Sequence, residues 1–535
     1  MSQDQQTGEA VGGGKAKKSK LLNSSLVVSA MTMISRVMGL IRDIVFAWFI
    51  GASGGADAFF VAFKIPNFLR RLFAEGAFAQ AFVPVLSEYR QKGSIDAVRH
   101  LIAHVSGCLG IAVASISALA VVGAPVLTFL FASGFYWQEP EKFALTVDLI
   151  RITFPYLALI SMAGFVSAVL NSYERFAIPA ITPVILNVVL ITAAVWVSPM
   201  MEEPAHALAW GVLVAGVCQF SFQLPFLYKA RLLVKPKVDW RDKSVRRVLA
   251  LMAPALFGVS ISQINLLLDT VLASWLVDGS VSWLYYSDRL IELPLGVFGV
   301  AIATVVLPAL SRQHTDACTN YSATLDWALR TVLFISVPAT VALMVLAKPI
   351  ITTLFQYGDR FSEHTSLMSS YSLIAYALGL SAFMLIKVLV TGYFSRQDTK
   401  TPVKIGIQAM LWNMLFNVIL VVPLHFYWGI GHVGLALATA GSAFFNASML
   451  LKGLISGGFY QIQVGWKKYF SQLLFSAVSM GAVLIGIVYV LPNFSVLTMF
   501  ARVSSMTMLC LAGLSTFMLS MYLLGWRLHS LKPAD

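Results

Sequence analysis

Long apolar runs dominate this sequence and constrain its fold more than any other feature. A transmembrane helix needs about 20 mostly apolar residues. Fourteen runs meet this length, near 26–50, 57–89, 99–131, 143–172, 178–198, 205–228, 247–276, 281–311, 323–347, 366–394, 402–424, 430–451, 467–491 and 498–525. Charged residues make up only 12% of the chain, well below the share of about 25% in soluble proteins. The sequence therefore predicts an all-α membrane protein with about 14 transmembrane helices.

Several of these runs are longer than a bilayer is thick and contain proline. Proline removes a helical hydrogen bond and is a common cause of sharp kinks. We therefore expect helices that are bent, tilted or extended beyond the membrane. The prolines concerned are Pro66, Pro84, Pro155, Pro294 and Pro308.

Lysine and arginine are distributed unevenly between the two sides of the predicted helices. With the N-terminus in the cytoplasm, 25 of the 38 basic residues fall in cytoplasmic segments and three in outer loops. This asymmetry predicts both termini in the cytoplasm. Residues 1–20 are polar and lysine-rich, and we expect a disordered cytoplasmic tail. Cleavage as a signal peptide is not expected, because the apolar stretch that follows is too long and carries charges.

The chain contains signs of an internal duplication at an offset of 224 residues. Residues 82–87 read FVPVLS, and residues 306–311 read VLPALS, so that Pro84 aligns with Pro308. The duplication predicts an N-lobe over 21–232 with helices 1–6 and a C-lobe over 233–456 with helices 7–12. Two further helices follow over 457–535. Two-lobed transporters bind substrate at the interface of the repeats, near the middle of the membrane.

Motifs for catalysis or metal binding are not found in the sequence. There is no GxxxxGK[ST] loop for ATP and no DDxxD or HExxH cluster. The four cysteines form no CxxC pair. His100 and His104 share a helix face, but no further ligand is close in sequence, so we interpret them as a solvated face. A membrane enzyme is therefore disfavoured, and no cofactor or resident metal is predicted.

Some charges inside the predicted helices have an opposite charge one helical turn away. Residues three or four positions apart share a helix face. By this rule Arg71 can pair with Glu75, Arg151 with Asp148, and Arg330 with Asp326. We expect structural roles for the last two pairs.

Other intramembrane arginines have no carboxylate at that spacing. These are Arg36, Arg42 and Arg70. Arg289 is an intermediate case, because Glu292 three residues later partly compensates its charge and Asp288 lies beside it. A charge at the bilayer centre costs roughly 2.5–3.5 kcal/mol on insertion scales, so such residues usually face an interior or a wet cavity. Two interpretations remain open.

In the first interpretation, distant carboxylates pair with these arginines across helices; the candidates are Asp43, Asp57, Asp269 and Asp288. In the second, a cationic cavity awaits the phosphate groups of a substrate, which the planar guanidinium binds in a bidentate manner. Lys387 and Asp269 lack local partners as well, and either one is a candidate for ion coupling or for a bridge between lobes.

Five stretches of the sequence form recognisable motifs: 35–43 (SRVMGLIRD), 56–78 (ADAFFVAFKIPNFLRRLFAEGAF), 154–156 (FPY), 285–290 (YYSDRL) and 393–398 (YFSRQD). They resemble the MurJ/MviN family of lipid II flippases, within the multidrug/oligosaccharidyl-lipid/polysaccharide exporter superfamily. The resemblance implies 14 helices, two lobes in a V and a groove for the polyprenyl tail beside the last two helices.

The same resemblance assigns roles to individual residues. It implies that Arg36, Arg42, Arg70 and Arg289 bind the substrate in a cationic cavity. It places Asp43 and Asp57 at acidic positions near the gate between the lobes. The predicted gate and charge network consists of Asp43, Asp57, Arg71, Glu75, Asp288 and Glu292.

We therefore expect a lipid II flippase of the bacterial inner membrane that works by alternating access. The alternatives are a flippase for another polyprenyl-pyrophosphate-linked oligosaccharide and a multidrug exporter on the same scaffold. The expected partners are lipid II (undecaprenyl-pyrophosphate-linked disaccharide pentapeptide), membrane lipids and the cell-wall synthesis machinery, and no nucleic acid. Membrane potential or an ion gradient would supply the energy.

Overall fold

The computed structural model describes residues 29–71, 78–313 and 318–527. In these ranges the chain forms helices joined by short connections, and none of the described residues lies in a strand. Eleven helices of the described part are long and apolar enough to cross a membrane. The predicted all-α membrane fold is confirmed, while the count of 14 helices stays a prediction. The predicted tail over 1–20 lies outside the described residues.

Three of the predicted runs are not among these eleven helices. The first forms a helix over 29–49 that carries three charged residues, Arg36, Arg42 and Asp43. The second is described as α2 (Gly54–Arg70) and α3 (Phe78–Lys92). The third forms α11 (Lys243–Ala273), which is 31 residues long.

The chain divides into two compact units that each combine separate segments. Unit 1 contains the chain up to Phe49 together with Val61–Leu130 and Glu139–Gln263. Unit 2 contains Ile50–Phe60, Phe131–Gln138 and the chain from Ile264 onward. The division falls inside both α2 and α11, so each of these helices contributes residues to both units.

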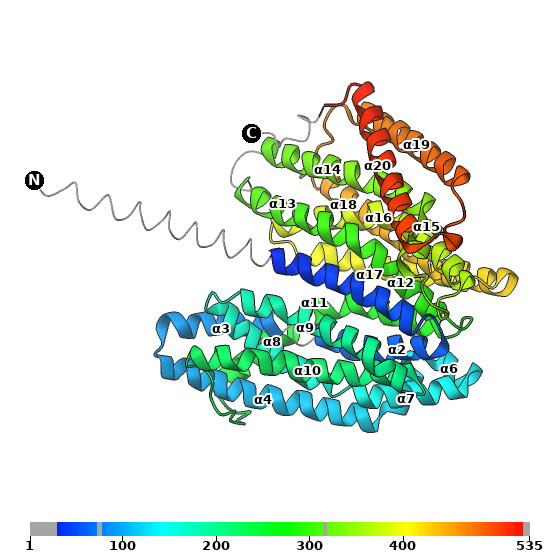
Figure 1. The fold of residues 1–535 in the computed structure, drawn as a ribbon. Coiled ribbons are helices and arrows are strands. Elements are labelled where there is room, and N and C mark those ends of the chain that lie inside the picture. Colours follow the sequence, from blue (N-terminus) through cyan, green and yellow to red (C-terminus); the bar gives the residue numbers. More distant parts are fainter. Residues whose placement is uncertain (1–28, 72–77, 314–317, 528–535) are drawn as a thin grey trace, which may run out of the picture. The chain divides into compact units, whose positions relative to one another are not determined.

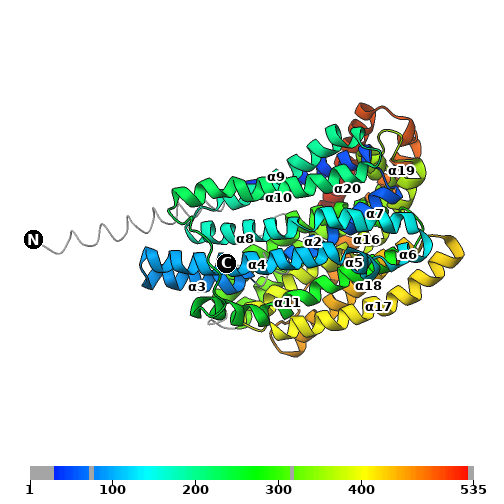
Figure 2. The ribbon, with the colours of Figure 1, turned by 90° about the horizontal axis from the view of Figure 1, so that it is seen from below.

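Unit 1 is a bundle of long helices around an aromatic and aliphatic core. Its further helices are α4 (Ile95–Val122), α5 (Ala124–Phe131), α7 (Pro140–Thr153), α8 (Tyr156–Ser172), α9 (Ala177–Thr192), η2 (Ala193–Val197), η3 (Ser198–Met200) and α10 (Pro204–Lys229). Helix α10 packs against α7, α8 and α9, and α8 also packs against α3 and α4 (Figures 1 and 2). Phe82 and Phe165, with ring centroids 5.1 Å apart, lie in the core between α3 and α8.

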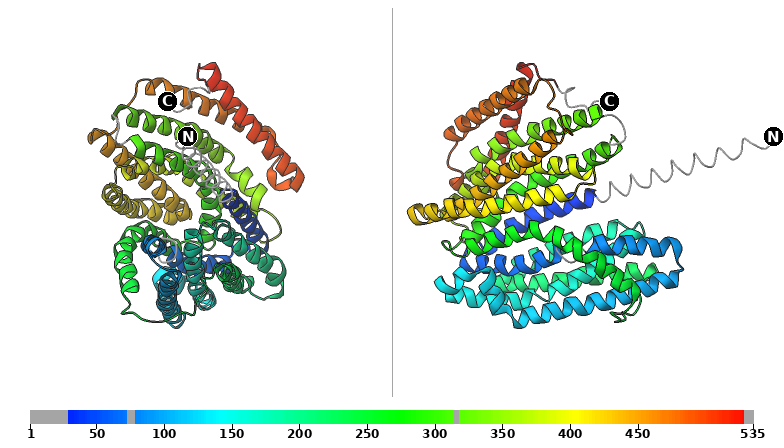
Figure 3. Two further views of the ribbon diagram at one scale, coloured as in Figure 1. Left: turned by 90° about the vertical axis from the view of Figure 1, so that its left-hand side faces the viewer. Right: turned by 180° about the vertical axis from the view of Figure 1, so that it is seen from behind.

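Unit 2 holds the remaining helices. They are α6 (Ser133–Gln138), α12 (Ser280–Pro294), η4 (Leu295–Gly299), α13 (Val300–Gln313), α14 (Cys318–Val345), α15 (Ala347–Phe355), α16 (Glu363–Phe394), α17 (Lys400–Trp428), α18 (Gly431–Ser456), α19 (Trp466–Val490), η5 (Phe494–Val496) and α20 (Met499–Leu523). Helix α16 packs against α14 and α18, and α17 packs along α18. The orange α19 and the red α20 lie side by side (Figure 3), and α19 also packs against α14.

Two of the five prolines interrupt their helices, whereas Pro66, Pro84 and Pro308 lie inside α2, α3 and α13. Helix α7 ends at Thr153 and α8 begins at Tyr156, with Pro155 between them. Pro294 is the last residue of α12, and the next five residues form the π-helical turn η4. Both breaks follow from the missing N–H group of proline, because the preceding turn loses a hydrogen-bond donor.

The helix bounds of the two halves of the chain agree with a duplication at an offset of 224. Shifted by this offset, α4 would span 319–346 and α5 would span 348–355. The structure has α14 at Cys318–Val345 and α15 at Ala347–Phe355. The weak sequence repeat therefore corresponds to a repeat of helices.

Candidate substrate-binding site

Arg42 is part of a buried polar triad in unit 1. Its Nε and Nη2 atoms donate to Asp43 Oδ1 at 3.0 and 2.7 Å. Its Nη1 atom donates to Asn187 Oδ1 on α9 at 3.1 Å. Asp43 is 1% exposed and Arg42 is 8% exposed. The expectation that Arg42 lacks a local counter-charge is therefore wrong, because its long side chain reaches the carboxylate of the next residue rather than one a turn away.

Arg36 lies on the same helix and is in a different situation. It is half-buried, and within the described residues its guanidinium group has no ion pair or hydrogen bond. Asn187 Nδ2 donates to the backbone oxygen of Ser35 at 3.2 Å, which ties this part of the helix to α9. Arg42 lies six positions after Arg36, which is about 9 Å along a helix axis. Asn187 thus binds both the backbone next to Arg36 and the side chain of Arg42.

Arg70 ends helix α2 and donates from Nε to Asn67 Oδ1 at 2.9 Å. The local acceptor is therefore an amide, in agreement with the absence of a carboxylate one turn away. The predicted partner of Arg71, Glu75, lies outside the described residues.

Arg289 on α12 has an acidic and an aromatic neighbour in unit 2. Its Nη1 atom lies 2.6 Å from Glu292 Oε2, which confirms the predicted pair. The guanidinium carbon lies 4.8 Å from the centroid of the Tyr285 ring, and that ring stacks on Phe60 with centroids 3.9 Å apart. Asp288 is half-buried on the same helix.

Asp57 caps the start of α12 within unit 2. Its Oδ2 atom accepts the N–H of Gly279 at 2.9 Å, and its Oδ1 atom accepts the N–H and hydroxyl of Ser282 at 2.8 and 2.5 Å. Gly279 has a φ of +89°, a conformation that side chains rarely tolerate. The Tyr286 hydroxyl donates to the backbone oxygen of Gly51 at 2.8 Å. Asp57 therefore fixes the segment Ile50–Phe60 to the helix that carries Arg289.

Asp269 lies in a second polar cluster of unit 2, formed by α11, α17 and α18. Asn417 Nδ2 donates to Asp269 Oδ1 at 3.1 Å and to Asn413 Oδ1 at 3.0 Å. The Thr439 hydroxyl donates to Asp269 Oδ2 at 3.5 Å. Asn417 Oδ1 is buried without a hydrogen-bond partner among the described residues. The exposed Lys387, the other charge without a local partner, contacts none of these residues through an ion pair or hydrogen bond.

The local pairs predicted for Arg151 and Arg330 are both present. Arg151 Nη1 lies 3.0 Å from Asp148 Oδ1 at an exposed position. Arg330 Nε lies 2.7 Å from Asp326 Oδ2.

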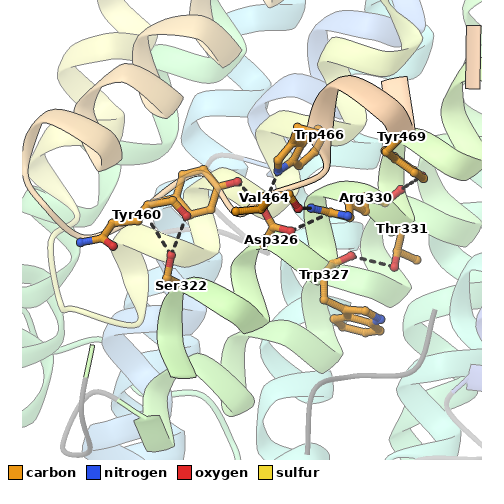
Figure 4. Close-up of polar contacts among 10 residues, drawn as sticks. Ser322, Asp326, Trp327, Arg330, Thr331, Tyr460, Val464, Trp466 and Tyr469 are labelled. Atoms are coloured by element: carbon orange, nitrogen blue, oxygen red, sulfur yellow. Dashed lines mark hydrogen bonds and ion pairs between the residues drawn. The ribbon is translucent and has the colours of Figure 1, made fainter. Parts of the chain in front are cut away.

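The carboxylate of Asp326 has two further partners at the junction with α19 (Figure 4). Its Oδ1 atom accepts from the Tyr460 hydroxyl at 2.7 Å and from Trp466 Nε1 at 2.6 Å. The Arg330 guanidinium also donates to the backbone oxygen of Val464 at 3.2 Å. This group, which we name the Asp326 cluster, joins α14 to the connection before α19.

Comparison with known proteins decides the family. A family model described as "Lipid II flippase MurJ" matches residues 46–505. The chain belongs to the lipid II flippase MurJ family.

Relatives in this family match the chain over nearly its whole length. A protein of Vibrio cholerae named "Probable lipid II flippase MurJ" is 48% identical over 522 residues, covering 96% of this chain and 98% of the relative. A protein of Burkholderia cenocepacia named "Lipid II flippase MurJ" is 44% identical, covering 85% of this chain and 88% of the relative. These names describe transporters.

Solved structures agree with this assignment. One described as "Lipid II flippase MurJ, inward closed conformation" matches with a TM-score of 0.78 and 28% identity, covering 93% of this chain and 98% of the other. A multidrug resistance MATE family transporter matches with a TM-score of 0.63 but only 14% identity, over 81% of this chain and 97% of the other. The second likeness shows the shared fold alone, so the fold of the MurJ family extends to drug exporters.

Sequence reasoning missed the amides of this MurJ family member. Asn187, Asn413 and Asn417 are all at most 5% exposed, and each lies in a polar cluster inside an otherwise apolar helix. A buried amide in an apolar helix needs hydrogen-bond partners just as a charge does. The same test that flagged the arginines would have flagged these residues.

Proposed function

We propose that this protein moves lipid II from the cytoplasmic to the periplasmic leaflet of the inner membrane by alternating access. Membership of the MurJ family supports the substrate, since the relatives are named lipid II flippases. The uneven distribution of basic residues supports termini in the cytoplasm. No covalent step is required, because flipping changes only the position of the lipid.

The observation that carries the proposed site is the guanidinium group of Arg36. It is half-buried in a helix of a membrane protein and has no ionic partner among the described residues. A guanidinium stays charged at every physiological pH and binds phosphate oxygens in a bidentate manner. The pyrophosphate of lipid II would therefore neutralise the positive charge of Arg36.

The other arginines contribute in different ways. Arg42 is held by Asp43 and Asn187, so we propose that it contributes by fixing the helix that carries Arg36 to α9. Arg70 and Arg289 are proposed as further phosphate ligands, with Glu292 and Tyr285 orienting the Arg289 side chain. A substrate drives the change of state only if one state binds it better than the other.

The cluster around Asp269 is a candidate for coupling to an ion gradient. It gathers carboxylate, amide and hydroxyl oxygens from three helices, and such oxygens are ligands for hard cations. Asn417 Oδ1, which is buried with no hydrogen-bond partner in the described part of the chain, supports the binding of a cation there. We expect that lipid II flipping by the Asp269→Asn variant no longer responds to collapse of the coupling ion gradient. If flipping by this variant responds to the collapse as the wild type does, the cluster has no part in ion coupling.

Complementation tests the proposed substrate site. Cells depleted of the protein should grow when they express the wild-type chain and should fail to grow with Arg36→Ala, although that variant reaches the membrane. Arg42→Ala, Arg70→Ala and Arg289→Ala should fail as well. Arg151→Ala is the matched control, because its exposed pair with Asp148 has no role in the site. Normal rescue by all four variants would show that the site is assigned wrongly.

A further inference from the structure

Two histidines and an aspartate converge on the surface of unit 1. His100 and His104 lie one turn apart on α4, and Asp242 is the last residue before α11. We propose that these three side chains form a binding site for a divalent transition-metal ion, with Zn²⁺ as the ion that their donor atoms fit best. No third ligand is close in sequence, and the fold brings in Asp242 from a distant part of the chain.

The three donor groups have the spacing of an incomplete metal site. One donor atom from each residue lies within 4.8 Å of the others. His100 Nε2 is 3.9 Å from Asp242 Oδ2, and the two imidazole centroids are 4.0 Å apart. Zinc–nitrogen and zinc–oxygen bonds of about 2.0–2.2 Å in tetrahedral geometry separate ligand atoms by about 3.4 Å. Small side-chain rotations would therefore bring all three atoms onto one ion.

Neighbouring groups already orient two of the ligands. Nδ1 of His104 lies 2.8 Å from the backbone oxygen of His100 and donates to it, so Nε2 is the ring nitrogen available to an ion. Oδ1 of Asp242 accepts the backbone N–H groups of Ser244 and Val245 at 2.8 and 3.2 Å. The other carboxylate oxygen, Oδ2, remains directed toward His100. Such outer contacts are a usual feature of metal sites, where they fix the ligand orientation.

The segment that ends at Asp242 is fastened to α4 by contacts that involve no metal. The N–H of Lys237 donates to the backbone oxygen of Ala103 at 2.9 Å, and Arg99 Nε donates to the backbone oxygen of Arg231 at 2.9 Å. Gly107 lets this segment come close, because a Cβ atom at this position would collide with the carbonyl of Lys237. The ligands are therefore held near one another before an ion arrives, which lowers the entropic cost of binding.

The cluster is placed where an aqueous ion can reach it. Helix α4 has 28 residues and a length of about 42 Å, whereas the hydrocarbon core is about 30 Å thick. Its first turns can thus stand outside the hydrocarbon core. The His100 side chain is 53% exposed. Two imidazoles and one carboxylate leave a fourth position for water, a donor set that suits Zn²⁺ better than Ca²⁺ or Mg²⁺, which prefer oxygen ligands.

A bound ion would link α4 to the start of α11 through shared coordination. The connection between α10 and α11 lies between these two helices, so metal binding would stiffen the passage from one half of the duplicated chain to the other. This site is independent of the substrate site proposed above.

Metal titration of the full-length protein, purified in detergent without a histidine tag, tests the site. Calorimetry with ZnCl₂ should give one saturable site per chain, and Zn²⁺ should raise the Tm. His100→Ala, His104→Ala and Asp242→Asn should each weaken this binding by about 10-fold or more. Asparagine can still cap α11, so the Tm of Asp242→Asn without zinc should equal that of the wild type.

His206→Ala is the matched control, because it removes a histidine on α10 that is not part of the cluster. It should bind Zn²⁺ as the wild type does. Equal affinity in the three ligand variants and the wild type, or the absence of saturable binding, would overturn the proposal.

Discussion

At the scale of single residues, Arg36 and Arg42 on one helix illustrate two ways to keep a positive charge inside a membrane protein. Arg42 is compensated by Asp43 and by the amide of Asn187. Arg36 is half-buried without an ionic partner in the described part of the chain. The contacts of Arg42 stabilise the fold, whereas the guanidinium group of Arg36 is available to bind an anionic ligand.

This difference predicts unequal effects of two alanine substitutions on stability. Arg42→Ala breaks the buried ion pair with Asp43, and removing one partner of such a pair typically costs about 3–5 kcal/mol. Arg36→Ala removes no ion pair with any described residue and should change the free energy of unfolding by about 0.5 kcal/mol or less. Thermal unfolding of the purified variants measures both effects. Adding Asp43→Asn to Arg42→Ala should restore part of the stability, and a larger loss in Arg36→Ala than in Arg42→Ala would contradict the assignment.

The spacing rule that found these arginines also shows what a sequence can predict at this scale. It identified the pairs of Arg151, Arg289 and Arg330 correctly, because those partners lie one turn away on the same helix. It failed for Arg42 because the rule ignores adjacent residues, whose directions differ by about 100° but which a long side chain can still reach. It could not place Asn187, since that contact depends on the packing of a distant helix.

At the scale of helices, single carboxylates fix several helix ends. Asp57 caps α12, Asp242 caps α11 and Asp398 caps α17. Sequence patterns predicted the positions of the long helices, and they placed Pro155 in a helix expected to be bent or tilted rather than broken. They could not reveal that Asp57 caps a helix more than 200 residues away, because that contact depends on tertiary structure.

Asp398 provides a prediction about pH. Hydrogen bonds from the side chain and backbone of Thr401, and from the backbone of Lys400, hold the pKa of Asp398 below its ordinary value, against a smaller opposing effect of burial. A carboxyl group whose pKa is lower in the folded protein stabilises the fold at pH values above its unfolded-state pKa of about 3.9. This stabilisation is lost as the pH falls through the folded-state pKa. The first turn of α17 should therefore lose amide-exchange protection only below about pH 4. Asp398→Asn should remove this pH dependence, and an identical pH profile in both proteins would disprove the cap.

The Asp326 cluster predicts how α19 is held to α14 (Figure 4). Asp326→Ala removes the acceptor for Tyr460, Trp466 and Arg330 together, so one buried donor and two half-buried donors lose this acceptor. We expect a loss of about 2–4 kcal/mol and faster proteolysis within 457–465. Asp148→Asn is the control, because it breaks an exposed pair that is worth little. Equal proteolysis rates in the two variants would mean that other contacts hold α19.

At the scale of the whole molecule, the repeat of helices in the two halves of the chain is the feature that the sequence predicted from the weakest signal. The match between Pro84 and Pro308 suggested an offset that the bounds of α4, α5, α14 and α15 reproduce. Every transmembrane helix needs a long apolar run, so the pattern of runs is retained in the two halves even where the individual residues differ. The polar clusters differ between the halves, since each one depends on a particular set of facing side chains.

The distribution of lipid II between the two leaflets tests the central claim most directly. It can be measured by the accessibility of lipid II to an external probe in cells depleted of the protein and then supplied with a variant. We predict that the wild-type chain and Arg151→Ala restore outward movement, while Arg36→Ala leaves lipid II in the inner leaflet and Arg36→Lys gives an intermediate level. Outward movement at the wild-type rate with Arg36→Ala would contradict the proposed binding of the substrate phosphate by this residue.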